Sequence, residues 1–220
     1  MNVLGFDTST AATSACLLRH DGEAFELTPP DDALVGPPAH ARELMPAIAR
    51  VLGEAGLGYT QLDAIAVGVG PGTFTGLRIG VASARALAHA HELPIHPVSS
   101  LAALAEGIDA ELRLPLVDAK RGELFAALQR GGEWLWPPFA AAPEALVERI
   151  RETSLSVRAA GDGSLRFRQA LEAGGVELAP PGAHAVRGLH VCRLAARVPP
   201  CQPEAVFPDY LREPDAKPQP

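Results

Sequence analysis

Two short runs of oxygen-bearing side chains follow apolar segments, and each begins with an aspartate. Residues 7–10 are Asp-Thr-Ser-Thr after the apolar residues 3–6, and Asp118 follows the apolar residues 114–117 in the sequence Asp-Ala-Lys-Arg-Gly-Glu. Hydroxyl and backbone N–H groups at a strand end can bind a phosphate, and an aspartate there can hold a hydrated metal ion. Each run is also explained as a turn whose hydrogen bonds are internal.

A third candidate is Gly161-Asp162-Gly163, which follows residues 157–160. Glycines there would let the backbone approach a nucleotide base or ribose, although Asp-Gly pairs also form turns that bind nothing. The candidate nucleotide contacts are therefore Asp7, Asp118 and Gly161.

Residues 70–80 form a glycine-rich turn between an apolar strand and a helix, with the sequence Gly-Pro-Gly-Thr-Phe-Thr-Gly-Leu-Arg-Ile-Gly. No Lys-Ser or Lys-Thr pair follows a glycine, so the turn is not a P-loop, and its third glycine comes one residue late for a dinucleotide fingerprint. Anion binding at the helix N-terminus and tight packing both explain the glycines. Arg78 lies in the first helical turn, where a cation opposes the helix dipole, and we expect it to have an anionic partner in this chain or another.

The histidines and cysteines do not form a metal site. His40 begins a predicted helix, but Leu44 occupies the position one turn later where a second ligand would stand, and the pattern HExxH is absent. The three cysteines lack a CxxC spacing. No Ser/His/Asp or Cys/His arrangement can be assigned either, so we predict no catalytic residue and no metal ligand.

Composition narrows the class of protein. The chain has 220 residues and a formal net charge of −7, which disfavours binding of nucleic acid by this chain alone. An odd number of cysteines and the lack of a basic, apolar leader favour a reducing cytoplasm. No apolar stretch reaches the roughly 18 residues of a membrane span.

The elements that would position these residues follow one order twice. The pattern predicts strands at 3–6, 13–19 and 23–27, a helix at 39–55, a strand at 62–69 and a helix at 77–92. After a strand at 95–98 and a helix at 101–107, strands are predicted at 114–117, 123–129 and 134–138. A helix at 143–152, a strand at 157–160 and helices at 165–173 and 184–198 complete the second half.

This order predicts two α/β lobes with mixed sheets covered by helices. We place the first lobe at residues 1–105 and the second at 106–198. Residues 199–220 contain seven prolines and are predicted to form an extended tail. Residues 28–38, with four prolines, are predicted to form a surface loop.

The sequence resembles the bacterial TsaB family, formerly called YeaZ. Residues 70–80 are the most specific match. The similarity extends to residues 3–10, to His40 with Glu43-Leu44-Met45-Pro46, and to residues 117–123, 160–163 and 208–212. It therefore covers nearly the whole chain.

The resemblance implies a two-lobed actin/Hsp70/sugar-kinase-like fold, which is ribonuclease H-like, and a role in forming N6-threonylcarbamoyladenosine beside the tRNA anticodon. In that pathway the related TsaD subunit transfers the threonylcarbamoyl group, TsaB is its obligate partner and TsaE is an ATPase that joins them. The resemblance also implies a homodimer in isolation, with tRNA reached indirectly through the complex and with no cofactor.

Departures from the catalytic relative favour a non-catalytic subunit. TsaD-like proteins hold a metal with two helical histidines, and Leu44 replaces one of them. Residues 7–10 also lack the glycines that let a phosphate sit close. The resemblance places the shared interface on the helices 39–55 and 77–92, whose small residues would bring the second helix close to another protein of the same fold. The candidate interface residues are His40, Leu44, Ile48, Gly76, Arg78, Gly80, Ser83 and Ala84.

Two alternatives stay open. One is an ATP-dependent, kinase-like enzyme of the same fold. The other is a metallopeptidase-like protein, which would need a metal site that the sequence does not contain.

Overall fold

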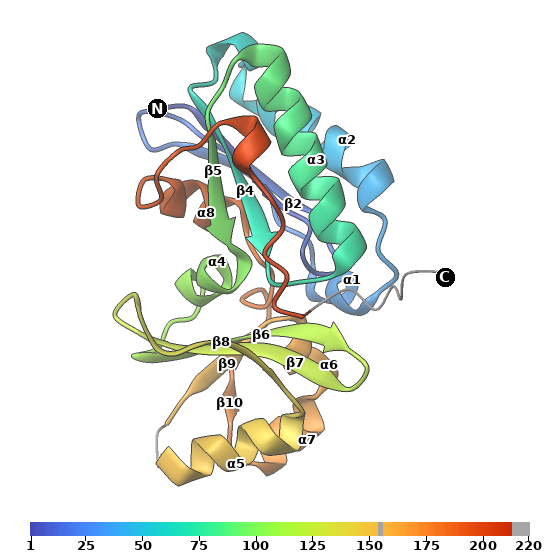
Figure 1. Ribbon diagram of the computed structural model, residues 1–220, viewed down its shortest axis with the longest axis vertical. Coiled ribbons are helices and arrows are strands. Elements are labelled where there is room, and N and C mark those ends of the chain that lie inside the picture. Colours follow the sequence, from blue (N-terminus) through green and yellow to red (C-terminus); the bar gives the residue numbers. More distant parts are fainter. Residues whose placement is uncertain (154–155, 213–220) are drawn as a thin grey trace.

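The computed structural model describes residues 1–153 and 156–212 and contains two five-stranded sheets, stacked along the long axis of the molecule (Figure 1). The first sheet has the order β3-β2-β1-β4-β5. Its strands are β1 (Val3–Asp7), β2 (Ser14–Leu18), β3 (Ala24–Leu27), β4 (Ala64–Gly70) and β5 (Ile95–Ser99). The strands β1, β2 and β3 are joined antiparallel, whereas β4 and β5 continue the sheet in parallel.

The second sheet repeats this plan. Its order is β10-β9-β6-β7-β8, in which β6, β7 and β8 are antiparallel and β9 and β10 are parallel to β6. The strands are β6 (Leu112–Lys120), β7 (Glu123–Arg130), β8 (Glu133–Ala141), β9 (Arg158–Ala160) and β10 (Glu177–Leu178). The predicted repetition of element order is therefore confirmed.

The helices cover the sheets and fill the space between them. In the first half they are α1 (Asp31–Val35), α2 (His40–Ala55), α3 (Phe74–His91) and α4 (Ser100–Glu106). In the second half they are α5 (Pro143–Thr153), α6 (Asp162–Arg166), α7 (Arg168–Ala173) and α8 (Gly188–Ala195). Two short 3-10 helices are η1 (Tyr59–Gln61) and η2 (Pro203–Ala205). None of the described helices is both long and apolar enough to cross a membrane.

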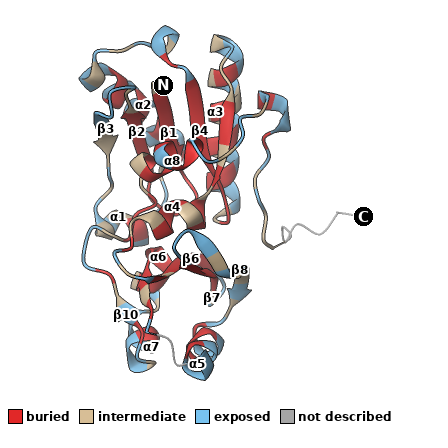
Figure 2. Cartoon of the chain, turned by 90° about the vertical axis from the view of Figure 1, so that its left-hand side faces the viewer, coloured by how far each residue is buried: buried red, intermediate tan, exposed pale blue. Residues whose placement is uncertain are grey.

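Three large apolar clusters form most of the core, and Ala12, Leu34 and Ala185 form a small fourth one. One packs the first sheet against α2 and α3, and another packs the second sheet against α5 and α7. The third joins the two sheets through α4 and α8, with Val98 and Leu101 from the first half and Val117 and Phe125 from the second. Figure 2 shows β1, β2 and β4 of the first sheet buried, whereas the edge strand β3 is only partly buried and the outer helices keep exposed faces.

Several predicted boundaries differ in the structure. α3 begins at Phe74 rather than at residue 77, so Gly76 lies inside the helix. The predicted helix 165–173 is two helices that meet at Phe167, whose φ of −108° is not helical. The loop 28–38 contains the short helix α1.

The predicted helix 184–198 shortens to α8, which packs on β1 and β2 of the first sheet. We propose the division at residue 105 as the boundary between the two sheets, with α8 returning from the second range to cover the first sheet.

Candidate functional site

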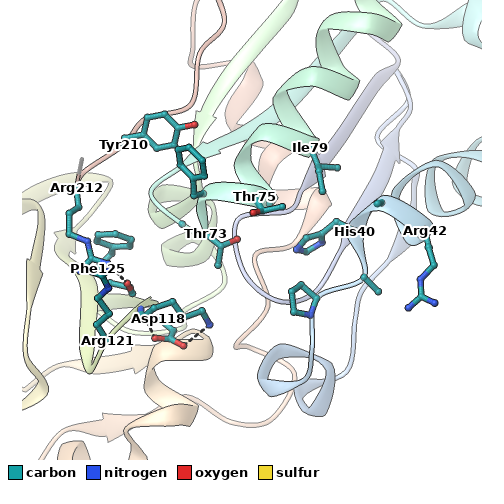
Figure 3. A pocket seen from close by; sticks show the side chains of 18 residues that line it. His40, Arg42, Thr73, Thr75, Ile79, Asp118, Arg121, Phe125, Tyr210 and Arg212 are labelled. Atoms are coloured by element: carbon teal, nitrogen blue, oxygen red, sulfur yellow. Dashed lines mark hydrogen bonds and ion pairs between the residues drawn. The ribbon is translucent and has the colours of Figure 1, made fainter. Parts of the chain in front are cut away.

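A pocket of about 770 Å³ lies between the two sheets. The first turns of α2 and α3 form one wall, the β6–β7 turn forms another, and the C-terminal segment closes a third side (Figure 3). The labelled lining residues are His40, Arg42, Thr73, Thr75, Ile79, Asp118, Arg121, Phe125, Tyr210 and Arg212. Of the three predicted nucleotide contacts, Asp118 alone lines this pocket.

Asp7 is buried outside the pocket, and internal donors use its carboxylate. Its Oδ1 accepts hydrogen bonds from the Ser9 backbone N–H at 2.7 Å and from the Ser9 hydroxyl at 2.6 Å. Its Oδ2 accepts from the Ser100 hydroxyl at 2.7 Å. Burial raises the pKa of Asp7, and the hydrogen bonds from Ser9 and Ser100 oppose that rise. Asp7 is thus an internal bridge between β1 and α4.

The turn that follows Asp7 is covered by the start of α3. The Thr73 N–H donates to the Ser9 carbonyl at 2.7 Å, and the Thr8 hydroxyl donates to the Gly76 carbonyl at 2.7 Å. A Cβ at Gly76 would overlap the Thr8 carbonyl oxygen. Only a glycine lets the helix lie this close to the backbone of residues 8–9.

Gly72 and Gly80 also allow this close contact. A Cβ at Gly72 would stand 2.5 Å from the Ser9 carbonyl oxygen, and one at Gly80 would overlap the Thr8 hydroxyl. The close neighbour of this helix is therefore the turn at residues 7–10 of the same chain, which is called the first turn below. The prediction that Gly76 and Gly80 bring the helix close to another protein is wrong for these two residues.

The turn at residues 118–123, called the second turn below, contains ion pairs. Asp118 accepts from the Lys120 backbone N–H and forms an ion pair with Lys120 Nζ, both at 2.8 Å, and Arg166 Nε lies 3.5 Å from its Oδ2. The Asp118 N–H donates to Asp162 at 3.0 Å. Burial, and secondarily the charge of Asp118, raises the pKa of Asp162 to about 7, against the opposing hydrogen bond from the Asp118 N–H.

Gly161 is a packing position. Its φ is 121°, and a Cβ there would overlap the Leu116 carbonyl oxygen, so glycine is required for close contact between the start of α6 and β6. Its N–H donates to His184 Nδ1 at 3.2 Å. Gly161 does not line the pocket, so the structure does not bring this candidate to the site that Asp118 lines.

His40 joins α2 to the β1–β2 loop. Its Nε2 lies 3.0 Å from the Thr10 carbonyl, which can only accept, so Nε2 carries the proton. Nδ1 is then free to accept from the Thr13 hydroxyl at 2.9 Å. Burial lowers the pKa of His40, which favours this neutral form. Within the described residues, no group of three His, Cys, Asp or Glu side chains could hold a metal ion.

Most of the predicted interface residues are buried within the chain. Leu44, Ile48, Gly80 and Ala84 lie on the inner faces of α2 and α3, so they are wrong as direct contacts to a partner. His40 and Gly76 are also buried, but they line the pocket. Ser83 is half-buried and Arg78 is exposed.

Arg78 has aromatic partners. Its guanidinium lies 3.7 Å from the centroid of the Phe74 ring, and its Nε donates to the Tyr210 hydroxyl at 3.1 Å. Among the described residues Arg78 forms no ion pair, so a cation–π contact and a neutral acceptor stand where an anionic partner within this chain was expected.

Arg42, Phe125, Tyr210 and Arg212 line the pocket but were not predicted from the sequence. Tyr210 and Arg212 belong to a segment that matched the resembled family, which was the available signal. Phe125 and Arg42 carry no local motif, because their place in the pocket depends on how the two sheets stack.

The comparisons with known proteins agree on one family. A family model described as TsaD, tRNA N6-adenosine threonylcarbamoyltransferase, matches residues 36–176. The tRNA threonylcarbamoyladenosine biosynthesis protein TsaB of Escherichia coli is 34% identical over 166 residues, which is 70% of this chain and 68% of that protein. The protein of the same name from Haemophilus influenzae is 36% identical over 129 residues, 57% of this chain. The chain spans about half of the Haemophilus protein, 52% of its length.

A solved structure supports the same assignment. An uncharacterized Pseudomonas aeruginosa protein, described as similar to peptidase YEAZ, superposes with a TM-score of 0.79 at 30% identity, over 96% of this chain and 99% of that chain. The predicted two-lobed α/β fold of the actin/Hsp70/sugar-kinase type is confirmed. This chain belongs to the TsaB (YeaZ) family.

Proposed function

We propose that this chain takes part in forming N6-threonylcarbamoyladenosine at the tRNA adenosine beside the anticodon. Its role there is that of a non-catalytic partner subunit, which scaffolds a TsaD-like transferase together with a TsaE-like ATPase. The family assignment supports the pathway, since the relatives from Escherichia coli and Haemophilus influenzae carry the name of that biosynthesis.

The closed first turn is the observation that most supports the non-catalytic role. A phosphate at residues 7–10 would need backbone N–H groups and hydroxyls that are open to solvent. Thr8, Ser9 and Thr10 are buried, and the start of α3 is hydrogen-bonded over them. Binding a phosphate there would require α3 to move away from the first sheet.

The hydrogen bonds made by both ring nitrogens of His40 support the same proposal. A metal-binding histidine must offer a ring nitrogen lone pair to the ion. In this chain Nε2 donates to Thr10 and Nδ1 accepts from Thr13, so metal binding would break one of two buried hydrogen bonds.

The charge balance supports indirect contact with tRNA. At a formal net charge of −7 the chain would repel the phosphate backbone, so the partner subunits supply the cationic surface.

The docking surface in this proposal is the outer faces of α2 and α3. Residues Ala82 and Ala86 lie one turn apart on α3 and are exposed, and so are Ala41, Met45 and Ala49 on α2. Small exposed side chains permit close approach of a partner helix. The same surface would hold a second copy of the chain in a homodimer when no other partner is present.

Reconstitution tests the proposed role. The purified chain, incubated with threonylcarbamoyl-adenylate and tRNA, should give no modified nucleoside. Addition of the TsaD-like and TsaE-like proteins and ATP should give it, as measured by mass spectrometry of digested tRNA. Modification by the chain alone would contradict the proposal.

Co-purification tests the surface. Ala82→Glu places a charge on the exposed face of α3 and should abolish capture of the TsaD-like protein. Ala145→Glu is the matched control, since Ala145 is an exposed alanine on α5 in the second half of the chain. Equal capture by the two variants would exclude this surface, while the family assignment would stand.

A kinase-like function is the second candidate, because the pocket of about 770 Å³ lies between the sheets and the N-termini of α2 and α3 form part of its wall. Calorimetric titration with ATP separates the two. Tight binding that is lost in an Asp118→Ala variant would favour the kinase.

A further inference from the structure

The C-terminal segment connects the two sheets on the side where the pocket opens. After α8 it returns along the first sheet, passes α3 and reaches the second sheet (Figure 1). We propose that residues 206–212 form an interlobe clamp that fixes how far the two lobes open around the pocket. This inference concerns the chain itself and does not depend on the proposed partners.

The first-lobe end of the clamp is firmly attached. Cys201 and Ile95 exchange two backbone hydrogen bonds, of 2.8 and 3.1 Å, which add the segment to the edge strand β5. Val206 is then buried in the apolar cluster beneath α3. The Asp209 N–H donates to the Val69 carbonyl at 2.7 Å, at the end of β4. Three attachments, to β5, to the cluster beneath α3 and to β4, therefore fix the path before it leaves the first lobe.

The glycine-rich turn makes room for this path. A Cβ at Gly70 would stand 2.7 Å from the Asp209 carbonyl oxygen, which is too close for any side chain without displacement of the backbone. Gly70 also has a φ of 124°, which favours glycine. The same run that seats α3 on the first turn thus admits the C-terminal segment beside β4.

Tyr210 marks the point where the segment crosses from the first lobe to the pocket. Its ring centroid lies 5.2 Å from that of Phe74, and its hydroxyl accepts from Arg78. Arg78 in turn covers the face of Phe74. The three side chains make one cluster at the start of α3, and Phe74 and Arg78 are its exposed members.

Arg212 holds the second lobe. Its Nη2 donates to the Ala119 carbonyl at 2.7 Å, and its Nη1 donates to the Glu123 carboxylate. These acceptors stand on both sides of the β6–β7 turn. The guanidinium fork suits two acceptors at once, which a lysine could not serve with the same geometry. Leu211 packs beside it against the cluster that joins the two sheets.

The geometry explains why this attachment would control the opening. α4 and α8 join the sheets through the shared apolar cluster, and Arg212 joins the first-lobe segment to the turn that forms the opposite pocket wall. Loss of Arg212 leaves the apolar cluster intact, so the lobes should stay folded but rotate more freely about it.

Distance measurement between the lobes tests the clamp. Spin labels on Glu54→Cys in α2 and Arg151→Cys in α5 would report the separation, in a Cys201→Ser background whose remaining cysteines, Cys16 and Cys192, are buried. The Arg212→Ala variant should give a broader distance distribution than the parent. Arg168→Ala removes an exposed arginine paired within α7 and should leave the distribution unchanged.

If the Arg212→Ala variant and the parent gave the same distance distribution, the proposal would be overturned. If Arg212→Ala lost its fold, as seen by circular dichroism, Glu123→Gln would replace it, because that variant weakens the second-lobe end without changing the segment. The same broadening is expected from Glu123→Gln, and an unchanged distribution would again overturn the clamp.

Discussion

Asp7 and Asp118 stand at equivalent places in the two sheets, each near the end of the strand that is antiparallel to one neighbour and parallel to the other. Asp7 is held by the hydroxyls of Ser9 and Ser100 and is sealed from the pocket. Asp118 forms part of the pocket wall and is paired with the exposed cations Lys120 and Arg166. The same strand end therefore serves as a packing joint in one lobe and as a charged surface turn in the other.

The cause of the difference lies in the element that follows each sheet's first parallel strand. After β4 the glycine run places α3 in close contact with residues 8–9. After β9 the chain enters the short helix α6, whose Asp162 accepts a hydrogen bond from the Asp118 N–H. This helix does not cover the side of the Asp118 turn that faces the pocket. A strand-end aspartate is therefore not enough to make a ligand site, because the next helix decides whether the turn stays accessible.

The largest effect on stability is expected for Asp162, the buried acid that is hydrogen-bonded to the second turn. With a folded pKa of about 7 against an ordinary value of 3.8, Asp162 is protonated in the folded chain and ionised in the unfolded one between these pH values. Its contribution to stability is therefore present below pH 3.8 and is lost as the pH rises to 7, by about 4 kcal/mol. Asp162→Asn removes this loss, so its stability relative to the parent should increase from pH 4 to pH 7 in urea titrations. A difference that stays constant with pH would show that Asp162 ionises normally.

Gly76→Ala tests the closed state of the first turn. The new Cβ would overlap the Thr8 carbonyl, and overpacking of this kind should cost about 3 kcal/mol in unfolding free energy. Gly53→Ala in α2 is the matched control, because a Cβ there meets nothing within 4 Å. Helix propensity alone should make that control more stable, by about 0.5 to 1 kcal/mol. Equal effects in chemical denaturation would mean that α3 does not press on the first turn.

Ser100→Ala removes one partner of Asp7. The Asp7 Oδ2 would lose its hydroxyl donor, and leaving a buried acceptor unsatisfied should cost about 2 kcal/mol in unfolding free energy. Burial raises the pKa of Asp7, and loss of a donor to the ionised form should raise it further, so the cost should shrink as the pH falls through the folded-state pKa. A loss that does not depend on pH would point to packing around Ser100 as its cause.

The sequence was sufficient for the elements and insufficient for their close contacts. Helix periodicity predicted residues 39–55, and Asp21-Gly22 predicted the β2–β3 hairpin, because both signals are local. The spacing of Gly72, Gly76 and Gly80 predicted that the helix packs closely against a neighbour. It did not identify that neighbour, because Thr8 lies 68 residues before Gly76. In the candidate site, Asp118 was likewise predicted from a local signal, because it directly follows an apolar strand.

Arg212 escaped the sequence analysis because its acceptor Glu123 lies 89 residues earlier. Nothing near residue 212 indicates that the segment returns to the second sheet. Similarly, the prolines of residues 28–38 concealed the helix α1, which starts after Pro30 rather than within a periodic apolar stretch. Contacts between distant segments follow from the stacking of the two sheets, which local patterns do not encode.

The smallest effect is expected for Lys120→Gln at the second turn. The Lys120 side chain is 52% exposed, so water screens its ion pair with Asp118, and the loss should be about 0.5 kcal/mol. Higher ionic strength should reduce this loss further, since salt weakens exposed pairs more than buried ones. Urea titrations of parent and variant at low and high salt measure the effect, with Arg50→Gln as the control for an exposed helical pair. A loss as large as that of Ser100→Ala, unaffected by salt, would mean that the two aspartates are held in the same way and would remove the distinction between the lobes.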